Sequence, residues 1–216
     1  MELTDVQRQK IYLAELKRLK TEIAPIAKFI DLSSLENDAF NVIFARIFTS
    51  DSPAYEMGNG SSGAHRSNWT YYTAGAMSQT AKICGYDCRF ECNGKRDAAI
   101  QTTEETPSVV LYAEWEWDYE DIFSKGKELD KLRFSCRASK TADAFLLTYF
   151  PADEFPQLVS SVVKYWQAAF SGRQDGPILY LHSIVHKRVR SIREFDRLST
   201  IAIQDNKVWL LSDLEL

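Results

Sequence analysis

The chain has 216 residues, of which 45% are hydrophobic, 12% aromatic and 26% charged, and its formal net charge is −4. This composition excludes a disordered or collagen-like chain, and the acidic total argues against a protein that coats nucleic acid without specificity. The length fits one compact domain, or a core domain with a helical extension, and we expect the second.

No apolar run is long enough to cross a bilayer, and the start of the chain lacks the basic and apolar regions of a signal peptide. We therefore expect a cytoplasmic protein that does not contact a membrane. The cysteines are expected as free thiols, because a chain of this length folds without disulfides. They are Cys84, Cys88, Cys92 and Cys136.

The first fifty residues are predicted to form an N-terminal helical region. Apolar side chains in residues 4–30 recur in steps of four and three, which predicts a helix, and Pro25 predicts a kink in it. This stripe is a candidate homodimer interface, and the alternative is packing on its own domain. A second helix is predicted over residues 34–49, where Phe and Ile side chains share one face.

Residues 51–66 are rich in Gly, Ser and Asn, and we predict a flexible loop there. The core is expected in residues 67–216, beginning with a helix capped by Ser67 or Asn68 and ended by Gly85. The elements expected next are strands at 86–93, 96–101 and 108–117, a helix at 119–133 and a strand at 144–150. The three strands form a meander, and the crossover helix makes the fourth strand parallel to the third.

The last part of the chain is expected to hold a helix between Pro151 and Gly172 and strands at 178–185, 199–204 and 208–211. A basic run lies between the first two of these strands. It contains Lys187, Arg188, Arg190 and Arg193. We predict that these side chains contact the phosphates of a nucleic acid, and the alternative is a solvated surface run.

Strand 108–117 carries two acids, Glu114 and Glu116, one pleat apart. Side chains alternate along a strand, so both acids face away from Trp115 and Trp117. Their alpha carbons are roughly 7 Å apart, a separation from which two carboxylates can converge on a hard cation. Packing does not require this pair, because the two charges repel each other. Asp97 on the preceding strand would complete a metal site; the alternative is a solvated acidic face.

The order of helix, three meandering strands, helix and strand, with an acid on the second strand and Glu-x-Glu on the third, resembles the PD-(D/E)XK nuclease superfamily. The resemblance covers residues 67–150 and implies an α/β (α+β) mixed sheet, the restriction-endonuclease-like core. It also implies that Asp97 and Glu114 bind Mg²⁺ or Mn²⁺. Glu116 stands where the family usually has lysine, which resembles the Glu-x-Glu variant among restriction enzymes. There it would bind metal or accept the proton of the attacking water.

Lys131 lies beside the buried face of the predicted helix 119–133 and would supply the missing lysine. The implied function is a metal-dependent nuclease, with DNA favoured over RNA as substrate. One rival is a non-catalytic binding protein with this or another α/β fold. A second is a glycosidase using Glu114 and Glu116, but the alternation turns the tryptophans that would hold a sugar away from both acids. Glu91 is interpreted as an exposed strand residue.

Overall fold

The computed structural model describes residues 4, 6–7, 10–11, 13–14, 17–18, 34–51, 63–92, 96–117, 119–139, 141–173, 176–189, 192–205 and 207–215, without the side chains of 34–36, 51, 63–68, 92, 188–189 and 192–194. Its helices are α2 (Ser34–Asp51), α4 (Gly63–Cys84), η2 (Asp121–Phe123, a 3-10 turn), α5 (Glu128–Ala138) and α6 (Phe155–Phe170). Its strands are β1 (Asp87–Cys92), β2 (Arg96–Gln101), β3 (Val109–Glu116), β4 (Asp143–Pro151), β5 (Leu179–Val189), β6 (Ile192–Gln204) and β7 (Lys207–Glu215).

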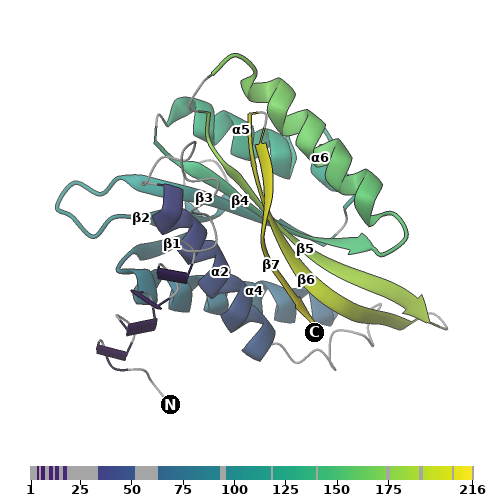
Figure 1. Cartoon of the computed structure of the whole chain (residues 1–216), viewed down its shortest axis with the longest axis horizontal. Coiled ribbons are helices and arrows are strands. Elements are labelled where there is room, and N and C mark those ends of the chain that lie inside the picture. The colour runs from purple at the N-terminus through teal and green to yellow at the C-terminus, as the bar shows by residue number, and fades with distance from the viewer. Residues whose placement is uncertain are drawn as a thin grey trace.

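The described strands form one sheet in which they lie in chain order from β1 to β7. Strands β1, β2 and β3 pair antiparallel, β3, β4 and β5 pair parallel, and β5, β6 and β7 again pair antiparallel. The sheet lies between two helical layers, with α5 and α6 above it and α2 and α4 below it in Figure 1. The mixed α/β class, the meander and the parallel crossover that the sequence predicts are confirmed.

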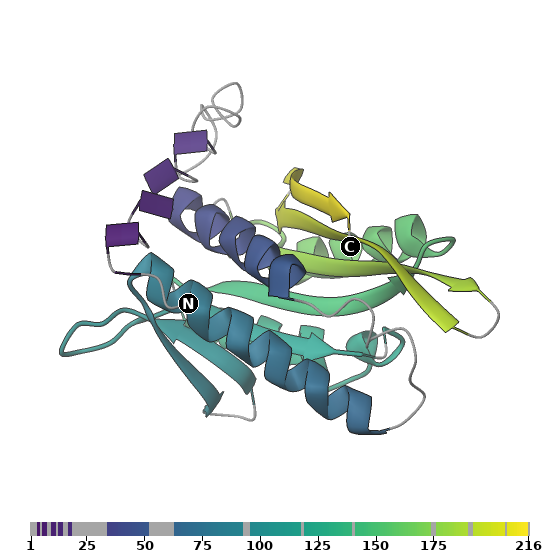
Figure 2. The same ribbon diagram turned by 90° about the horizontal axis from the view of Figure 1, so that it is seen from below.

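Each face of the sheet has its own hydrophobic core. Leu111, Ala113 and Trp115 of β3 belong to the lower core, together with α2 and α4. Figure 2 shows these two helices running side by side across that face. The upper core contains Leu129 of α5 and Trp166 of α6. Because the two faces of β3 belong to different layers, its acidic side is directed at α5.

Helix α2 is joined to the sheet by polar side chains inside the lower layer. The Tyr180 hydroxyl donates to Asp38 Oδ1 at 2.7 Å, and the side chain of Asn37 donates to Asp143 Oδ2 at 2.7 Å. Burial raises the pKa of Asp38 to about 7, although the Tyr180 hydrogen bond opposes this shift. The predicted N-terminal extension therefore contributes to the core of the fold through α2.

The imidazole of His182 on β5 is held by two further buried hydrogen bonds. Asn41 donates from its amide nitrogen to the Asn37 carbonyl, so its Oδ1 accepts from His182 Nε2 at 2.8 Å. The Thr200 hydroxyl then donates to His182 Nδ1 at 3.1 Å. Burial lowers the pKa of His182 to about 3, so the ring is neutral at physiological pH.

Two predicted boundaries on the core were wrong. Helix α4 begins at Gly63 rather than at Ser67 or Asn68, because a helix gains one hydrogen bond per added residue and a Ser or Asn is only a weak signal to start one. Residues 63–66 are thus helical, and 52–62 of the predicted loop lie outside the described residues. The helix predicted at 119–133 is instead the turn η2 followed by α5, because Gly126, with φ 78°, breaks it.

The C-terminal strands are longer than the sequence predicts. Strands β5 and β6 pair from Leu179 with Ile203 to Val189 with Ile192. Residues 186–189 and 192–193 of the basic run therefore lie on these two strands, where polar side chains are tolerated because pairing continues through the backbone. The predicted kink at Pro25 lies outside the described residues. The predicted dimer interface in residues 4–30 stays a prediction for the same reason. None of the helices in the described part of the chain combines the length and apolarity needed to cross a membrane.

Candidate active site

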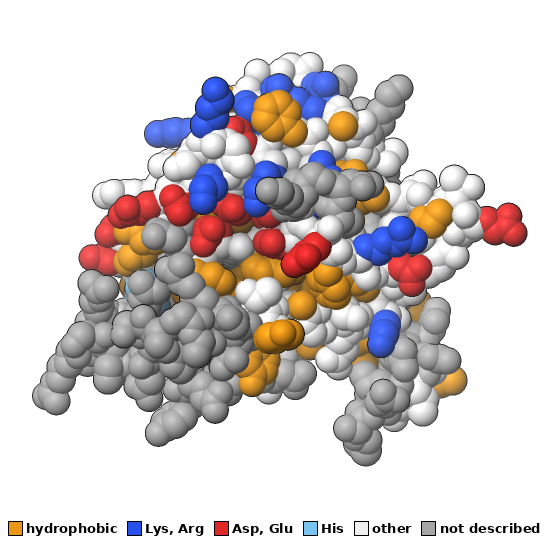
Figure 3. Space-filling view, turned by 180° about the vertical axis from the view of Figure 1, so that it is seen from behind, with side chains coloured by type: hydrophobic (Ala, Val, Ile, Leu, Met, Phe, Trp, Pro, Cys, Tyr) orange, Lys and Arg blue, Asp and Glu red, His pale blue; other side chains and the backbone are white. Residues whose placement is uncertain are grey.

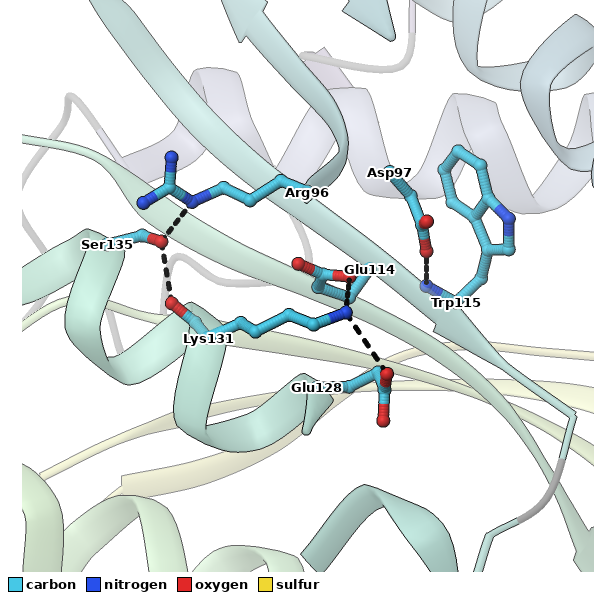
Figure 4. A network of polar contacts seen from close by, with 7 residues as sticks. All are labelled: Arg96, Asp97, Glu114, Trp115, Glu128, Lys131 and Ser135. Atoms are coloured by element: carbon cyan, nitrogen blue, oxygen red, sulfur yellow. Dashed lines mark hydrogen bonds and ion pairs between the residues drawn. The ribbon is translucent and has the colours of Figure 1, made fainter. Parts of the chain in front are cut away.

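Asp97 on β2 and Glu114 on β3 lie opposite each other. The strands pair Ala98 with Ala113, so the next two residues outward are also opposed. Because Ala98 and Ala113 belong to the lower core, both carboxylates are on the upper face, toward α5. The backbone N–H of Trp115 donates to Asp97 Oδ2 at 2.8 Å (Figure 4). This bond fixes the orientation of the Asp97 carboxylate.

Lys131 reaches this pair of acids from α5. Its Nζ lies 3.1 Å from Glu114 Oε2 and 3.2 Å from Glu128 Oε1, and Figure 4 shows the ammonium between the two carboxylates. Glu114 is fully buried and Glu128 is 5% exposed. The other carboxylate oxygens, Glu114 Oε1 and Glu128 Oε2, are buried and have no hydrogen-bond partner among the described residues. A single ammonium thus satisfies only half of the oxygens of these two acids.

Burial and mutual repulsion shift the pKa values of the site. Burial, reinforced by the charge of Asp97, raises the pKa of Glu114 to about 8, and Lys131 only partly opposes this. Burial also raises the pKa of Asp97 to about 6, against the Trp115 hydrogen bond. Burial disfavours the charge on Lys131, but Glu114 and Glu128 outweigh it and raise the pKa of that amine. The site therefore favours added positive charge.

Glu116 lies at the edge of the cluster. It is half-buried, and its Oε1 accepts from the backbone N–H of Trp117 at 2.7 Å. Its backbone neighbour on β4 is Thr148. The Glu116 charge contributes to the raised pKa of Asp97, so the two carboxylates interact. Glu116 thus shares the face of Glu114, with one oxygen directed at its own strand.

Helix α5 is fastened to β2 beside the site. Arg96 Nε donates to the hydroxyl of Ser135, which donates to the carbonyl of Lys131 at 2.6 Å (Figure 4). The Arg96 guanidinium also lies over the Tyr112 ring, 4.6 Å from its centroid. Together with the buried Leu129 and Leu132, these contacts set the distance between α5 and the acidic strands.

The structure brings together Asp97, Glu114 and Lys131, with Glu116 beside them. Of the predicted phosphate-binding residues, Lys187 and Arg188 lie on β5 and Arg193 lies on β6 rather than in this cluster, and Arg190 is outside the described residues. Lys187 is exposed and its Nζ lies 2.6 Å from Asp196 Oδ1. The side chains of Arg188, Arg190 and Arg193 are outside the described part of the chain.

Glu128 is the acid that the sequence reasoning did not include. Its signal was the spacing of three residues from Lys131, which places both side chains on one side of a helix. Glu91, the other acid considered, is exposed on β1. Glu128 therefore joins the cluster, while Glu91 is an exposed strand residue, as predicted.

The acids of the site supply the kind of ligand that a hard divalent cation takes, but they do not lie in a metal-binding arrangement. In the described part of the chain, no three Asp, Glu, His or Cys side chains are close enough to hold a metal ion as they lie. The available donors are nevertheless carboxylate oxygens, the ligands that Mg²⁺ and Mn²⁺ prefer. Two of these oxygens, on Glu114 and Glu128, are buried and unpartnered. Their desolvation cost would be offset by a bound cation.

One face of the molecule is divided by charge. In Figure 3, acidic side chains form a band across the middle, at the level of the sheet, and Lys and Arg gather above it in the layer of α5 and α6. Hydrophobic side chains lie below the band. Acidic and basic side chains therefore lie next to each other on this face.

No protein-family model, no curated protein and no solved structure matches this chain. The chemistry of the protein is therefore inferred from Asp97, Glu114 and Lys131 and from the elements that carry them.

Proposed function

We propose that the protein is a metal-dependent nuclease of the PD-(D/E)XK type, which hydrolyses phosphodiester bonds in nucleic acid, with DNA favoured, and uses Mg²⁺ or Mn²⁺. One observation carries this proposal: Asp97 and Glu114 face each other on adjacent strands, and Lys131 meets Glu114 from the crossover helix. The order α4, β1, β2, β3, α5, β4, with β4 parallel to β3, supports it, because this order underlies the resemblance.

Asp97 and Glu114 would hold the cation, as the resemblance implies. When bound, a divalent ion lowers the pKa of a water molecule and neutralises charge that develops on the phosphate in the transition state. Both acids must be ionised to bind it, and their raised pKa values mean that the cation competes with protons near neutral pH.

Two contacts and the position of Glu116 support a role for each of three side chains. The Trp115 N–H holds one Asp97 oxygen at 2.8 Å, so the orientation of this carboxylate is set before substrate binds. Lys131 places a positive charge beside Glu114, where it would stabilise the negative charge of the transition state. Glu116, half-buried at the edge of the site, would accept the proton of the attacking water.

The test is cleavage of supercoiled plasmid, single-stranded DNA and RNA by the wild-type chain and by Glu114→Gln, each with Mg²⁺, Mn²⁺ or EDTA. We expect cleavage by the wild type with either metal and none with EDTA. The isosteric Glu114→Gln chain should lose cleavage by at least about 100-fold. Equal cleavage by both chains would identify a contaminating nuclease and contradict the proposal.

A second candidate is a nucleic-acid-binding protein without catalytic activity. The position of Lys131 favours this second candidate, because its ammonium already lies between Glu114 and Glu128 and partly neutralises them. In this case the wild type binds nucleic acid equally well with and without divalent ions and cleaves none of the three substrates. The cleavage assay above therefore separates the two candidates.

The glycosidase alternative is not supported by the placement of the tryptophans. Trp115 is 8% exposed and belongs to the lower core, on the face opposite to Glu114. Trp117 packs on Trp69, with ring centroids 4.6 Å apart. Neither ring lies beside the acids, so neither offers a sugar a surface on which to stack.

A further inference from the structure

Glu128 is buried at a position where packing does not call for a carboxylate. It is the first residue of α5 and is 5% exposed, while the neighbouring Leu129 and Leu132 fill the upper core. Burying a carboxylate is unfavourable unless its oxygens have partners, and Glu128 Oε2 has none in the part of the chain that the structure describes. The Lys131 ammonium, 3.2 Å from Glu128 Oε1, serves the other oxygen.

Glu128 is also directed at the same site as the two strand acids. Its partner Lys131 lies 3.1 Å from Glu114 Oε2, so one nitrogen joins the carboxylates of α5 and β3. The charge of Glu128 raises the pKa of Asp97 as well as that of Glu114. Three acids from β2, β3 and α5 therefore interact with the Lys131 ammonium, and two of them have a buried oxygen that lacks a partner among the described residues.

Glu116, the third ligand that the resemblance implies, is less well placed. It is half-buried, and one of its oxygens already accepts the Trp117 N–H at 2.7 Å. Its effect on the pKa of Asp97 is smaller than that of Glu128. Glu116 thus lies toward the rim, which suits contact with a water molecule better than a place among the buried ligands.

We infer that Glu128 is a ligand of the divalent ion together with Asp97 and Glu114, and that the ion binds in competition with the Lys131 ammonium. This inference rests on the proposed function. Helix α5 is held against the strands by the contacts of Arg96 and Ser135, so the Glu128 backbone is fixed. Lys131, by contrast, is 26% exposed and has a flexible side chain, so when a cation binds its ammonium can leave the two carboxylates and remain beside the site, where its charge would face the phosphate.

The test is calorimetric titration of Mn²⁺ into four full-length chains at pH 8: wild type, Glu128→Gln, Glu116→Gln and Glu105→Gln. Glu105, exposed in the β2–β3 loop, gives the same charge change away from the site. We expect Glu128→Gln to raise the Kd for Mn²⁺ at least about tenfold. Glu116→Gln should change it less than about threefold, and Glu105→Gln should leave it unchanged.

Two outcomes contradict different claims. If the wild type binds Mn²⁺ and Glu128→Gln binds it equally well, the assignment of Glu128 is overturned while the nuclease proposal stands. If the wild type binds no Mn²⁺, the metal-dependent function itself fails. Should Glu128→Gln not fold, Glu128→Asp keeps the charge and withdraws the carboxylate by one methylene. It should weaken Mn²⁺ binding by several-fold, and an unchanged Kd would overturn the inference equally.

Discussion

The ammonium of Lys131 lies 3.1 Å from Glu114 Oε2, and this ion pair joins the crossover helix α5 to the acidic strand β3. The same nitrogen serves Glu128, so one positive charge faces two buried acids. Such an arrangement is weak as a source of stability but costly to break, because removal of one partner leaves the others buried and uncompensated.

Lys131→Met should therefore lower the stability of the metal-free protein by about 1–3 kcal/mol, less than for a fully buried pair because Lys131 is 26% exposed. Thermal unfolding at pH 8 with and without Mn²⁺ measures this, and Mn²⁺ should restore more stability to the variant than to the wild type. The control is Lys127→Met, whose partner Asp121 is 3.6 Å away at the surface, where such pairs contribute about 0–1 kcal/mol. Equal losses in the two variants would contradict the prediction.

Asp97→Asn should trade activity for stability. The amide oxygen still accepts the Trp115 N–H, while the charge that repels Glu114 and Glu128 is removed. Because burial raises the pKa of Asp97 to about 6, its ionised form destabilises the fold at pH 8, and the variant should gain about 1–2 kcal/mol. Urea unfolding and the plasmid assay check both effects; cleavage should fall at least about 100-fold. A variant that is less stable and fully active would refute this account.

The stability of the protein should also depend on pH through Asp38, which lies on the opposite side of the sheet from the candidate active site. Its pKa is raised to about 7 in the folded state, against an ordinary value of 3.8, so the folded chain holds this proton more tightly than the unfolded chain. The contribution to stability is complete below pH 3.8 and is lost as the pH rises toward 7, with a slope of up to about 1.4 kcal/mol per pH unit.

The measurement is the free energy of unfolding of the wild type and Asp38→Asn from pH 4 to 8. His182, whose pKa is lowered to about 3, acts in the opposite sense, because the unfolded state gains a proton as the pH falls below 6.5. The prediction therefore concerns the difference between the two chains. The wild type should lose stability relative to Asp38→Asn as the pH rises, and parallel curves would contradict the raised pKa.

Asn41→Ala should destabilise the protein by about 1–3 kcal/mol, because His182 Nε2–H would be left buried without an acceptor. Urea unfolding of the variant gives this value. Gln157→Ala, an exposed position on α6, is the matched control and should change stability by less than about 0.5 kcal/mol. A loss of stability in Asn41→Ala as small as that in Gln157→Ala would contradict the prediction, because it would show that the imidazole finds another partner.

The basic run of residues 186–193 remains a predicted contact with the phosphate backbone of a nucleic acid. Replacing Arg188, Arg190 and Arg193 with Ala should weaken nucleic-acid binding equally across sequences. It should also reduce the salt dependence of binding by roughly one unit of slope for each phosphate that the variant no longer neutralises. Fluorescence anisotropy at several salt concentrations measures both effects, and Lys164→Ala, exposed on α6, is the control. An unchanged salt slope in the triple variant would exclude these residues from the interface.

The fold could be predicted to the level of element order because strong local signals mark it. Alternation predicted β3 and its two faces, and Pro151 and Gly172 marked the stretch in which α6 lies. The errors lie where tertiary pairing decides. Strands β5 and β6 extend through polar residues because each supplies the backbone partners of the other, and Gly126 interrupts a helix that side-chain spacing alone predicted to be continuous.

The site was predictable where neighbours in sequence become neighbours across a sheet. Asp97 and Glu114 followed from the meander, and Lys131 from its place beside the buried face of the next helix. Glu128 was missed because its burial depends on how closely α5 approaches β2, which the Arg96 and Ser135 contact determines. The polar contacts of α2 with Tyr180 and His182 join residues more than 140 positions apart, so no local sequence pattern predicts them.

Those contacts of α2 also bear on how far the chain could be trimmed. The stretch that resembles a nuclease core starts after α2, yet Phe40, Phe44 and Phe48 of this helix are buried in the lower core. A polypeptide that begins at residue 63 lacks α2, so it would expose the apolar surface on which these rings pack. It would also leave the Tyr180 hydroxyl without Asp38 and the His182 imidazole without Asn41. We therefore expect the polypeptide without α2 to aggregate, so that the proposed active site cannot be separated from this helix by truncation.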